Sequence, residues 1–176
     1  MSDESKADFL THHSLLITNM NLSDMTIRSA NNDDGERVTR LVFGVLAEFG
    51  LEGDPDTTDA DLRDIEANYR QRGGMFEVIE DGAANLLGSF GLYRINKMTC
   101  ELRKMYFIPG VRGSGLGKYV LERVIAQARE LGCKQIVLET SSKLMAANRL
   151  YTKFGFEPAY SDHLASRADQ FYKLDL

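Results

Sequence analysis

The residues best suited to bind a ligand form a glycine-rich stretch, "RGSGLGK", at residues 112–118. The residues that follow carry apolar side chains at helical spacing, so the stretch is predicted to lead into a helix. The first four amides of a helix have no partner within it, and that end carries about half a positive charge. Arg112 and Lys118 add two cations, and the alternating glycines leave the amides accessible. These features predict a cradle for an anion such as a pyrophosphate.

Three other interpretations of this stretch compete with the cradle. A Walker loop requires GxxxxGK followed by Ser or Thr, but Arg112 stands at the first glycine position and Tyr119 replaces the hydroxyl residue. A dinucleotide fingerprint, GxGxxG, fails because its last position falls on Lys118 or Val120. A glycine-rich turn that binds no ligand is the remaining alternative. The flanking cations and the following helix weigh against it.

The order of helices and strands around the stretch follows from the spacing of apolar residues. Asp33 and Gly50 are expected to cap and end the first helix, and Asp81-Gly82 is a hairpin signal. Strands are predicted at residues 25–30, 75–81, 84–95, 100–109, 134–140, 156–160 and 170–176, and helices at 32–50, 58–72, 116–131 and 142–155.

These elements predict an α/β fold with a mixed, mostly antiparallel central sheet and helices on both faces. The early strands are hairpin-linked, whereas the strand–helix–strand unit at 101–138 predicts a right-handed parallel crossover. Residues 25–176 are expected to form a single domain after an N-terminal arm, residues 1–24. In that arm "SLLIT" is a possible short strand, and His12 and His13 are interpreted as ordinary tail residues.

Composition excludes several classes of protein. The net charge is -5, from 21 basic and 26 acidic residues, which argues against nucleic acid as a partner. No apolar run approaches the ~20 residues that a bilayer requires, and the acidic N-terminus is unlike a signal peptide. Cys100 and Cys133 belong to no zinc motif, so no metal is expected. We therefore expect a cytoplasmic protein with free thiols and no membrane partner.

Three segments in order resemble the GNAT superfamily of N-acetyltransferases. Arg112-x-x-Gly115-x-Gly117 matches the family's R/Q-x-x-G-x-G/A loop, "ELRKMYFIP" at 101–109 is similar to its fourth strand, and "ANRLYTKFGFEP" at 147–158 is similar to its late helix. The resemblance spans roughly residues 25–160 as an order of elements. It implies a splayed parallel strand pair and acetyl-coenzyme A (acetyl-CoA) as co-substrate. The implied cofactor-binding residues are Met105, Tyr106, Phe107, Arg112, Gly113, Ser114, Gly115, Leu116, Gly117, Lys118 and Asn148.

The resemblance also implies two catalytic residues. Tyr151 occupies the position of the tyrosine that protonates the departing sulfur, although it also fits the apolar face of its helix. Glu101 lies where several members of the family carry a general base, although it could instead pair with Arg103. If the strand has no bulge, Glu101, Arg103, Met105 and Phe107 share one face.

The sequence says least about which molecule accepts the acetyl group. The first hypothesis is transfer to a primary amine of a small molecule or amino acid. The alternatives are a protein lysine or N-terminal acetyltransferase and a non-catalytic CoA-binding regulatory module. The last strand, at 170–176, could complete its own sheet or pair across a homodimer.

Several weaker candidates could shape the acceptor site. Glu139 lines the cleft or caps the next helix, and His163 and Arg167 occupy a polar loop that could touch substrate. An acidic cluster in or beside the first inter-helix loop either attracts a cationic amine or is merely solvated; it comprises Glu48, Glu52 and Asp54.

Overall fold

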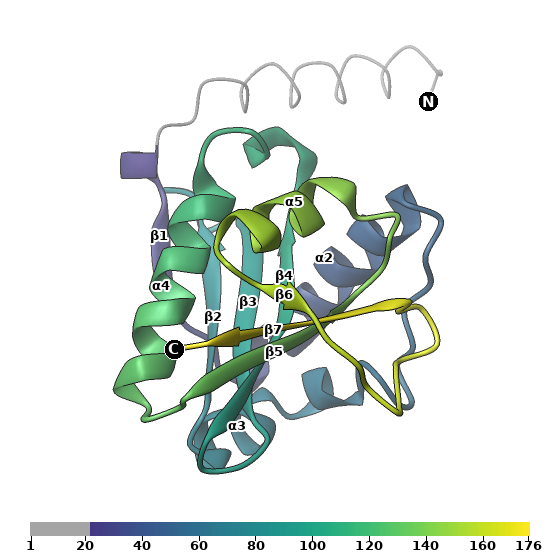
Figure 1. The fold of residues 1–176 in the computed structure, drawn as a ribbon. Helices are drawn as coiled ribbons and strands as arrows, with labels where there is room; N and C mark the ends of the chain where they lie inside the picture. Colours follow the sequence, from purple (N-terminus) through teal and green to yellow (C-terminus); the bar gives the residue numbers. More distant parts are fainter. Residues whose placement is uncertain (1–21) are drawn as a thin grey trace.

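The computed structural model describes residues 22–176, and Figure 1 shows how its elements are arranged. The strands are β1 (Thr26–Ser29), β2 (Met75–Glu80), β3 (Leu86–Arg94), β4 (Thr99–Phe107), β5 (Gln135–Thr140), β6 (Glu157–Pro158) and β7 (Gln170–Asp175). The α-helices are α2 (Gly35–Glu48), α3 (Ile65–Asn68), α4 (Leu116–Glu130) and α5 (Met145–Lys153). Short 3-10 turns are η1 (Leu22–Asp24), η2 (Asn32–Asp34), η3 (Ala60–Arg63), η4 (Arg70–Arg72) and η5 (Pro109–Val111).

The strands form one seven-stranded sheet in the order β1-β2-β3-β4-β5-β7-β6. Every neighbouring pair is antiparallel except β4 and β5, which are parallel and joined through α4. The predicted mixed sheet with one parallel pair is therefore confirmed. Because β7 lies between β5 and β6, the last strand completes the sheet of its own chain.

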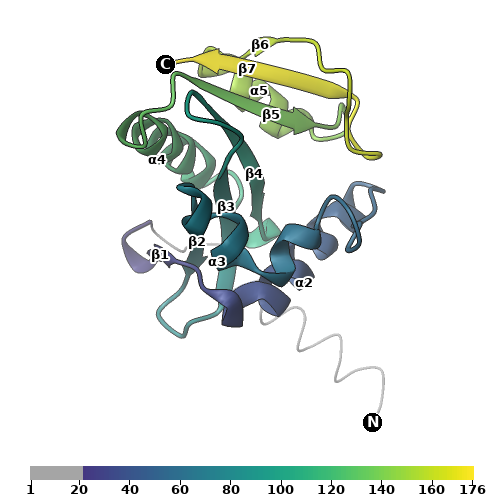
Figure 2. The same ribbon diagram turned by 90° about the horizontal axis from the view of Figure 1, so that it is seen from below.

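Helices cover both faces of the sheet, as predicted, because each carries an apolar stripe (Figures 1 and 2). Helix α2 buries Val38, Val42 and Leu46 against α3 and the β2 residues Phe76 and Val78. Helices α4 and α5 pack on the other face in a second cluster, which includes the buried residues Leu116, Val120, Leu121, Val124, Tyr151 and Phe156. The two clusters hold the sheet between them.

A bulge in β4 breaks the expected alternation of its side chains. Between Gly91–Arg103 and Ser89–Tyr106, β3 advances by two residues and β4 by three. The extra residue leaves Lys104 at φ +55°, a left-handed conformation that is uncommon for residues other than glycine. The Ser89 hydroxyl donates to the Lys104 carbonyl at 2.8 Å. The single-face pattern expected for residues 101–107 is therefore wrong beyond Arg103, because the bulge resets which side chains face which way.

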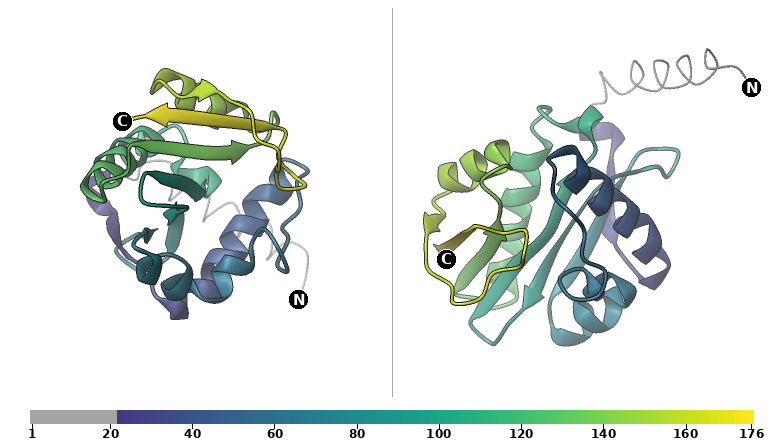
Figure 3. Two further views of the ribbon diagram at one scale, coloured as in Figure 1. Left: turned by 60° about the horizontal axis from the view of Figure 1, so that its bottom comes forward. Right: turned by 90° about the vertical axis from the view of Figure 1, so that its right-hand side faces the viewer.

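Strands β4 and β5 part after a short common stretch. Their register contains three pairs, from Thr99–Gln135 to Glu101–Val137, and no later residue of β4 pairs with β5. In Figures 2 and 3, β5 and β7 turn away from β2–β4. This confirms the splayed pair, and it leaves a groove between the two strands toward the C-terminal end of β4.

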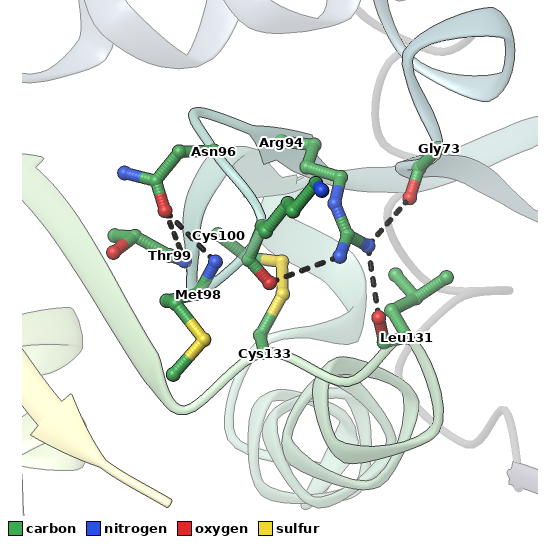
Figure 4. Close-up of a disulfide and its surroundings, with 9 residues drawn as sticks. Gly73, Arg94, Asn96, Met98, Thr99, Cys100, Leu131 and Cys133 are labelled. Atoms are coloured by element: carbon green, nitrogen blue, oxygen red, sulfur yellow. Dashed lines mark hydrogen bonds between the residues drawn. A yellow bond between two sulfur atoms is a disulfide. The ribbon is translucent and has the colours of Figure 1, made fainter.

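A disulfide joins the two cysteines at the end of the sheet where β4 and β5 are still paired. Cys100 and Cys133 lie 6.1 Å apart between their Cα atoms, and Figure 4 shows the bond beneath the turn that leads into β4. The prediction of free thiols is therefore wrong. Parallel pairing of β4 and β5 brings together two residues that are 33 positions apart in the sequence. Nearby, the Arg94 side chain donates to the carbonyl groups of Gly73 and Leu131.

Three local predictions also differ from the structure. Residues 58–72 form η3, α3 and η4 instead of one helix, because Asp59 and Asp61 turn into the protein. Asn31, not Asp33, makes the capping box before α2, and Asp34 closes it. Strand β6 contains two residues of the five expected. Within residues 22–176, no helix is long and apolar enough to cross a membrane. "SLLIT", His12 and His13 lie outside the described residues.

Candidate acetyl-CoA and acceptor site

A cavity of about 780 Å³ occupies the groove between β4 and β5. The end of α2, the glycine-rich loop before α4, helix α5 and the loop before β7 complete its walls. Most predicted site residues line this cavity: Glu101, Met105, Tyr106, Phe107, Arg112, Gly113, Gly115, Gly117, Lys118 and Tyr151. The chain thus brings its glycine loop, one candidate acid and one candidate base to a common space.

The glycine loop has the open backbone that an anion cradle requires. Gly113 and Gly115 adopt φ values of +78° and +91°, which favour glycine, and a Cβ at either position would meet no atom within 4 Å. Gly115 is the N-cap of α4, so the unpaired first amides of the 15-residue helix follow it directly. At Gly117 a Cβ would lie 3.2 Å from Leu150 Cδ2, so glycine also allows α4 to approach α5.

Arg112 has partners within the chain. Its terminal nitrogens donate to the two carboxylate oxygens of Glu48 at 2.6 and 3.2 Å, and its Nε donates to the Phe107 carbonyl at 2.9 Å. The guanidinium also lies 5.6 Å from the centre of the Phe49 ring. Arg112 therefore ties the loop to the end of α2. The loop's main anion-binding groups are then its backbone amides and the exposed ammonium of Lys118, which among the described residues has only a long, exposed ion pair of 3.8 Å with Glu122.

The ring of Tyr151 packs against the ring of Phe156 in the core, and the two ring centres are 5.8 Å apart. The residue is 7% exposed, yet it lines the cavity, and its hydroxyl makes no hydrogen bond to another described residue. Burial raises the pKa of this phenol, and the nearby Tyr106 raises it further. Tyr151 therefore keeps its proton at neutral pH, as a proton donor must.

Glu101 forms an ion pair with Arg103, as the alternative interpretation of the sequence held. The Arg103 Nε donates to Glu101 Oε2 at 2.7 Å, and the guanidinium stacks 3.9 Å from the centre of the Tyr93 ring. Burial raises the pKa of Glu101, the Arg103 charge opposes this shift, and the charge of Glu139 adds to it. The carboxylate still lines the cavity, so the ion pair and a role as base are compatible.

A buried ionic cluster beside the cavity was missed by sequence reasoning. The side chain of Asp59 has no exposed surface and accepts from the Lys104 ammonium at 2.7 Å. Both terminal nitrogens of Arg167 donate to the same carboxylate, at 2.6 and 2.8 Å. Lys104 also donates to the Thr58 carbonyl at 2.8 Å and lies 3.2 Å from Asp61. The cluster joins the loop after α2, the β4 bulge and the loop before β7. Figures 1 and 2 show that the two loops lie on the same side of the molecule.

Comparisons with known proteins agree with this geometry. Residues 42–156 match the family model of the acetyltransferase (GNAT) family. The chain belongs to this family. An uncharacterised N-acetyltransferase of Escherichia coli, YjgM, is 37% identical over 74% of this chain and 81% of its own. The L-methionine sulfoximine/L-methionine sulfone acetyltransferase of Salmonella typhimurium is 30% identical over 75% of this chain and 80% of its own.

Solved structures agree as well. A GNAT acetyltransferase of Staphylococcus aureus Mu50 superposes with a TM-score of 0.80 at 27% identity, covering 86% of this chain and 98% of its own. The predicted resemblance is confirmed, and the protein is an N-acetyltransferase of the GNAT family. The residues present fit acetyl-CoA, because the unfilled space over Gly113 and Gly115 opens into the cavity that Tyr151 lines.

Three of the residues predicted to bind the cofactor do not line the cavity between β4 and β5. The Ser114 hydroxyl donates to the Val111 carbonyl, and Leu116 is buried in the core. The Asn148 amide donates to the Ser141 carbonyl and to Gln170, and its oxygen accepts from Thr140. Asn148 therefore fastens α5 to β5 and β7. A direct contact between these three side chains and the cofactor stays a prediction.

The weaker candidates separate into two groups. Glu139, His163 and Arg167 line the cavity, and Glu139 accepts the Ala165 amide instead of capping a helix. The acidic cluster Glu48, Glu52 and Asp54 does not line it. Glu48 pairs with Arg112 and Asp54 accepts from Thr57, so the neighbouring Thr57 and Thr58 form this part of the wall. Within residues 22–176, no group of three potential ligands is placed to hold a metal.

Proposed function

We propose that this GNAT protein transfers the acetyl group of acetyl-CoA to the primary amine of a small molecule or amino acid by direct attack. One observation carries the proposal: a single cavity connects the glycine loop to Tyr151, Glu101 and Glu139. The cofactor and a small acceptor can therefore occupy the same space. Such positioning of two reactants can contribute about 7–11 kcal/mol to lowering the barrier.

Each reacting group has a residue suited to it. When bound, acetyl-CoA supplies an activated thioester that an amine can attack. Glu101 takes a proton from the ammonium of the acceptor, directly or through water, and Tyr151 gives its hydroxyl proton to the departing sulfur. Met105, Tyr106 and Phe107 line the cavity just after the bulge, and we assign to a backbone amide of this stretch the stabilisation of the oxygen that gains charge.

The walls of the cavity favour a small acceptor over a protein chain. The ion pair between Arg167 and the buried Asp59 fastens the loop before β7 to the loop after α2, which closes one side of the site. The similar Salmonella protein is named for two small molecules, L-methionine sulfoximine and L-methionine sulfone. Both observations support transfer to a small molecule.

Release of the free thiol from acetyl-CoA tests the proposal. Purified protein is incubated with a panel of small amines and amino acids and, separately, with lysine-containing and free N-terminal peptides, and acetylated products are identified by mass spectrometry. Turnover with small amines is expected. Turnover with peptides alone supports a protein acetyltransferase. Acetyl-CoA binding by calorimetry without any turnover supports a regulatory module.

A further inference from the structure

The part of the cavity between β4, β5 and residues 163–168, called here the acceptor end, holds charged side chains of both signs. Glu101 and Glu139 come from the two diverging strands, and Arg167 and His163 come from the loop before β7. The proposed reaction uses Glu101 alone among these residues. Two of the other residues, Glu139 and Arg167, carry opposite charges at the acceptor end.

Glu139 provides a carboxylate that no cation neutralises among the described residues. The register pairs Glu101 with Val137, so Glu139, two residues further along β5, lies on the same face nearer the groove. Its Oε2 accepts the Ala165 amide at 2.9 Å, and no described Lys, Arg or His forms an ion pair with it. Glu101, in contrast, is already paired with Arg103. Glu139 is therefore available to form an ion pair with the ammonium of an acceptor.

Arg167 has hydrogen-bond donors that are not used by other described residues. A guanidinium has five N–H groups. Two of them reach Asp59, and the Tyr106 hydroxyl beside it can take one more. At least two donors remain on a side chain that lines the cavity and is 13% exposed. Because Asp59 is buried and also holds Lys104, the guanidinium is fixed in place. Asp59 occupies the fork between its two terminal nitrogens, and the N–H groups that remain can donate to a carboxylate or a phosphonate.

The loop before β7 holds both charged residues of the acceptor end, Glu139 and Arg167, in place. The Ala165 amide holds Glu139, and Arg167, two residues later, is held by Asp59. We propose that the acceptor is a small amine that also carries an acid group, with its ammonium at Glu139 and its acid group at Arg167. This inference rests on the proposed acetyl transfer and names the class of acceptor.

Two matched pairs of amines test the inference. β-Alanine is compared with ethylamine, and L-methionine with 3-(methylthio)propylamine, so that each pair differs in one carboxylate. A hydrogen-bonded charged group contributes about 1.5–3 kcal/mol. We expect kcat/KM to be about 10- to 100-fold higher for the acid-bearing member of at least one pair. A higher value for the acid-free amine in both pairs overturns the inference and leaves acetyl transfer intact.

Variants assign the preference to the two residues. Arg167→Gln should bring the ratio within the pair toward one by raising KM for the acid-bearing member. The ratio is compared within one variant, so a loss of stability does not affect it, and Arg167→Lys should give an intermediate ratio. Glu139→Gln should raise KM for both members. Arg149→Gln, an exposed residue outside the cavity, is the matched control and should change neither. An unchanged ratio in Arg167→Gln overturns the role of Arg167.

Calorimetry separates this inference from the proposed function. Absence of acetyl-CoA binding to the wild-type protein refutes the transferase site itself. If acetyl-CoA binds and neither pair is acetylated, the CoA-loaded protein is titrated with β-alanine and L-methionine. Binding of either one, weakened by Arg167→Gln, supports the acid-group site. Binding of neither overturns it.

Discussion

Replacing Asp59 by Asn tests whether the buried ionic cluster holds the cavity wall together. The substitution keeps the shape of the side chain and removes the charge that faces both Lys104 and Arg167. Removing one partner of a buried ion pair costs about 3–5 kcal/mol. Lys104 keeps the Thr58 carbonyl and Asp61 as neighbours, so we expect a loss near 3 kcal/mol. For a domain of this size the loss lowers Tm by about 6–12 °C.

The pH dependence of stability provides an independent measure of the same interaction. Burial alone would raise the pKa of Asp59, but the hydrogen bonds from Arg167 and the charge of Lys104 lower it from 3.8 to about 2. A carboxyl with a lowered pKa in the folded state stabilises the protein above its unfolded pKa. That stabilisation, about 2 kcal/mol, is lost as pH falls from about 4 through 2. The difference between wild type and Asp59→Asn should shrink over this interval.

Thermal unfolding followed by circular dichroism at pH 7 and at pH 2–4 measures both effects. Asp56→Asn is the matched control, because Asp56 belongs to the same loop and forms an exposed ion pair with Arg63. An exposed pair of this kind contributes about 0–1 kcal/mol. A Tm for Asp59→Asn that falls no further than that of Asp56→Asn would refute the reasoning. So would a difference that does not change on acidification.

Three further predictions concern the reaction and the disulfide. Tyr151→Phe should lower kcat about 10²- to 10⁴-fold in the thiol-release assay while calorimetry shows unchanged acetyl-CoA binding; unchanged turnover removes Tyr151 from the mechanism. Since burial raises the pKa of Glu101, the acid limb of kcat/KM should lie above pH 4.5 in the wild type and be absent in Glu101→Gln; identical profiles exclude Glu101 as the base. The disulfide closes a loop of 33 residues and should contribute about 3–4 kcal/mol, so a reductant should lower Tm in the wild type but not in a Cys100→Ala/Cys133→Ala variant. Equal Tm values with and without reductant in the wild type contradict this.

The features that sequence reasoning predicted are those encoded locally. The apolar stripe of α4 and the glycines before it are contiguous, so periodicity predicted both the helix and its open entrance. Hairpin signals and one helical crossover predicted the antiparallel early strands and the parallel pair of β4 and β5. Each of these signals lies within one short segment of the sequence, the longest being the crossover at 101–138, and the structure confirms them.

The features that were missed depend on contacts between distant segments. Asp59 lies among several other acidic residues at the start of the helix predicted for residues 58–72, and no local pattern marks it as buried. Its burial depends on Lys104, whose direction is set by a bulge in β4, and on Arg167, 108 residues away. The disulfide likewise requires β4 and β5 to be parallel neighbours before Cys100 and Cys133 can meet. Nothing local in the sequence indicates either contact.

The short register between β4 and β5 has a consequence for how the protein opens. β5 shares three residue pairs with β4 but six with β7, so residues 135–176 are bonded more extensively among themselves than to the remaining sheet. Backbone amides of β5 and β7 should therefore exchange with deuterium as one cooperative group, separate from β2 and β3. With the disulfide intact, the two groups stay joined at one end, so any movement of one group relative to the other is confined to the opposite ends of β4 and β5.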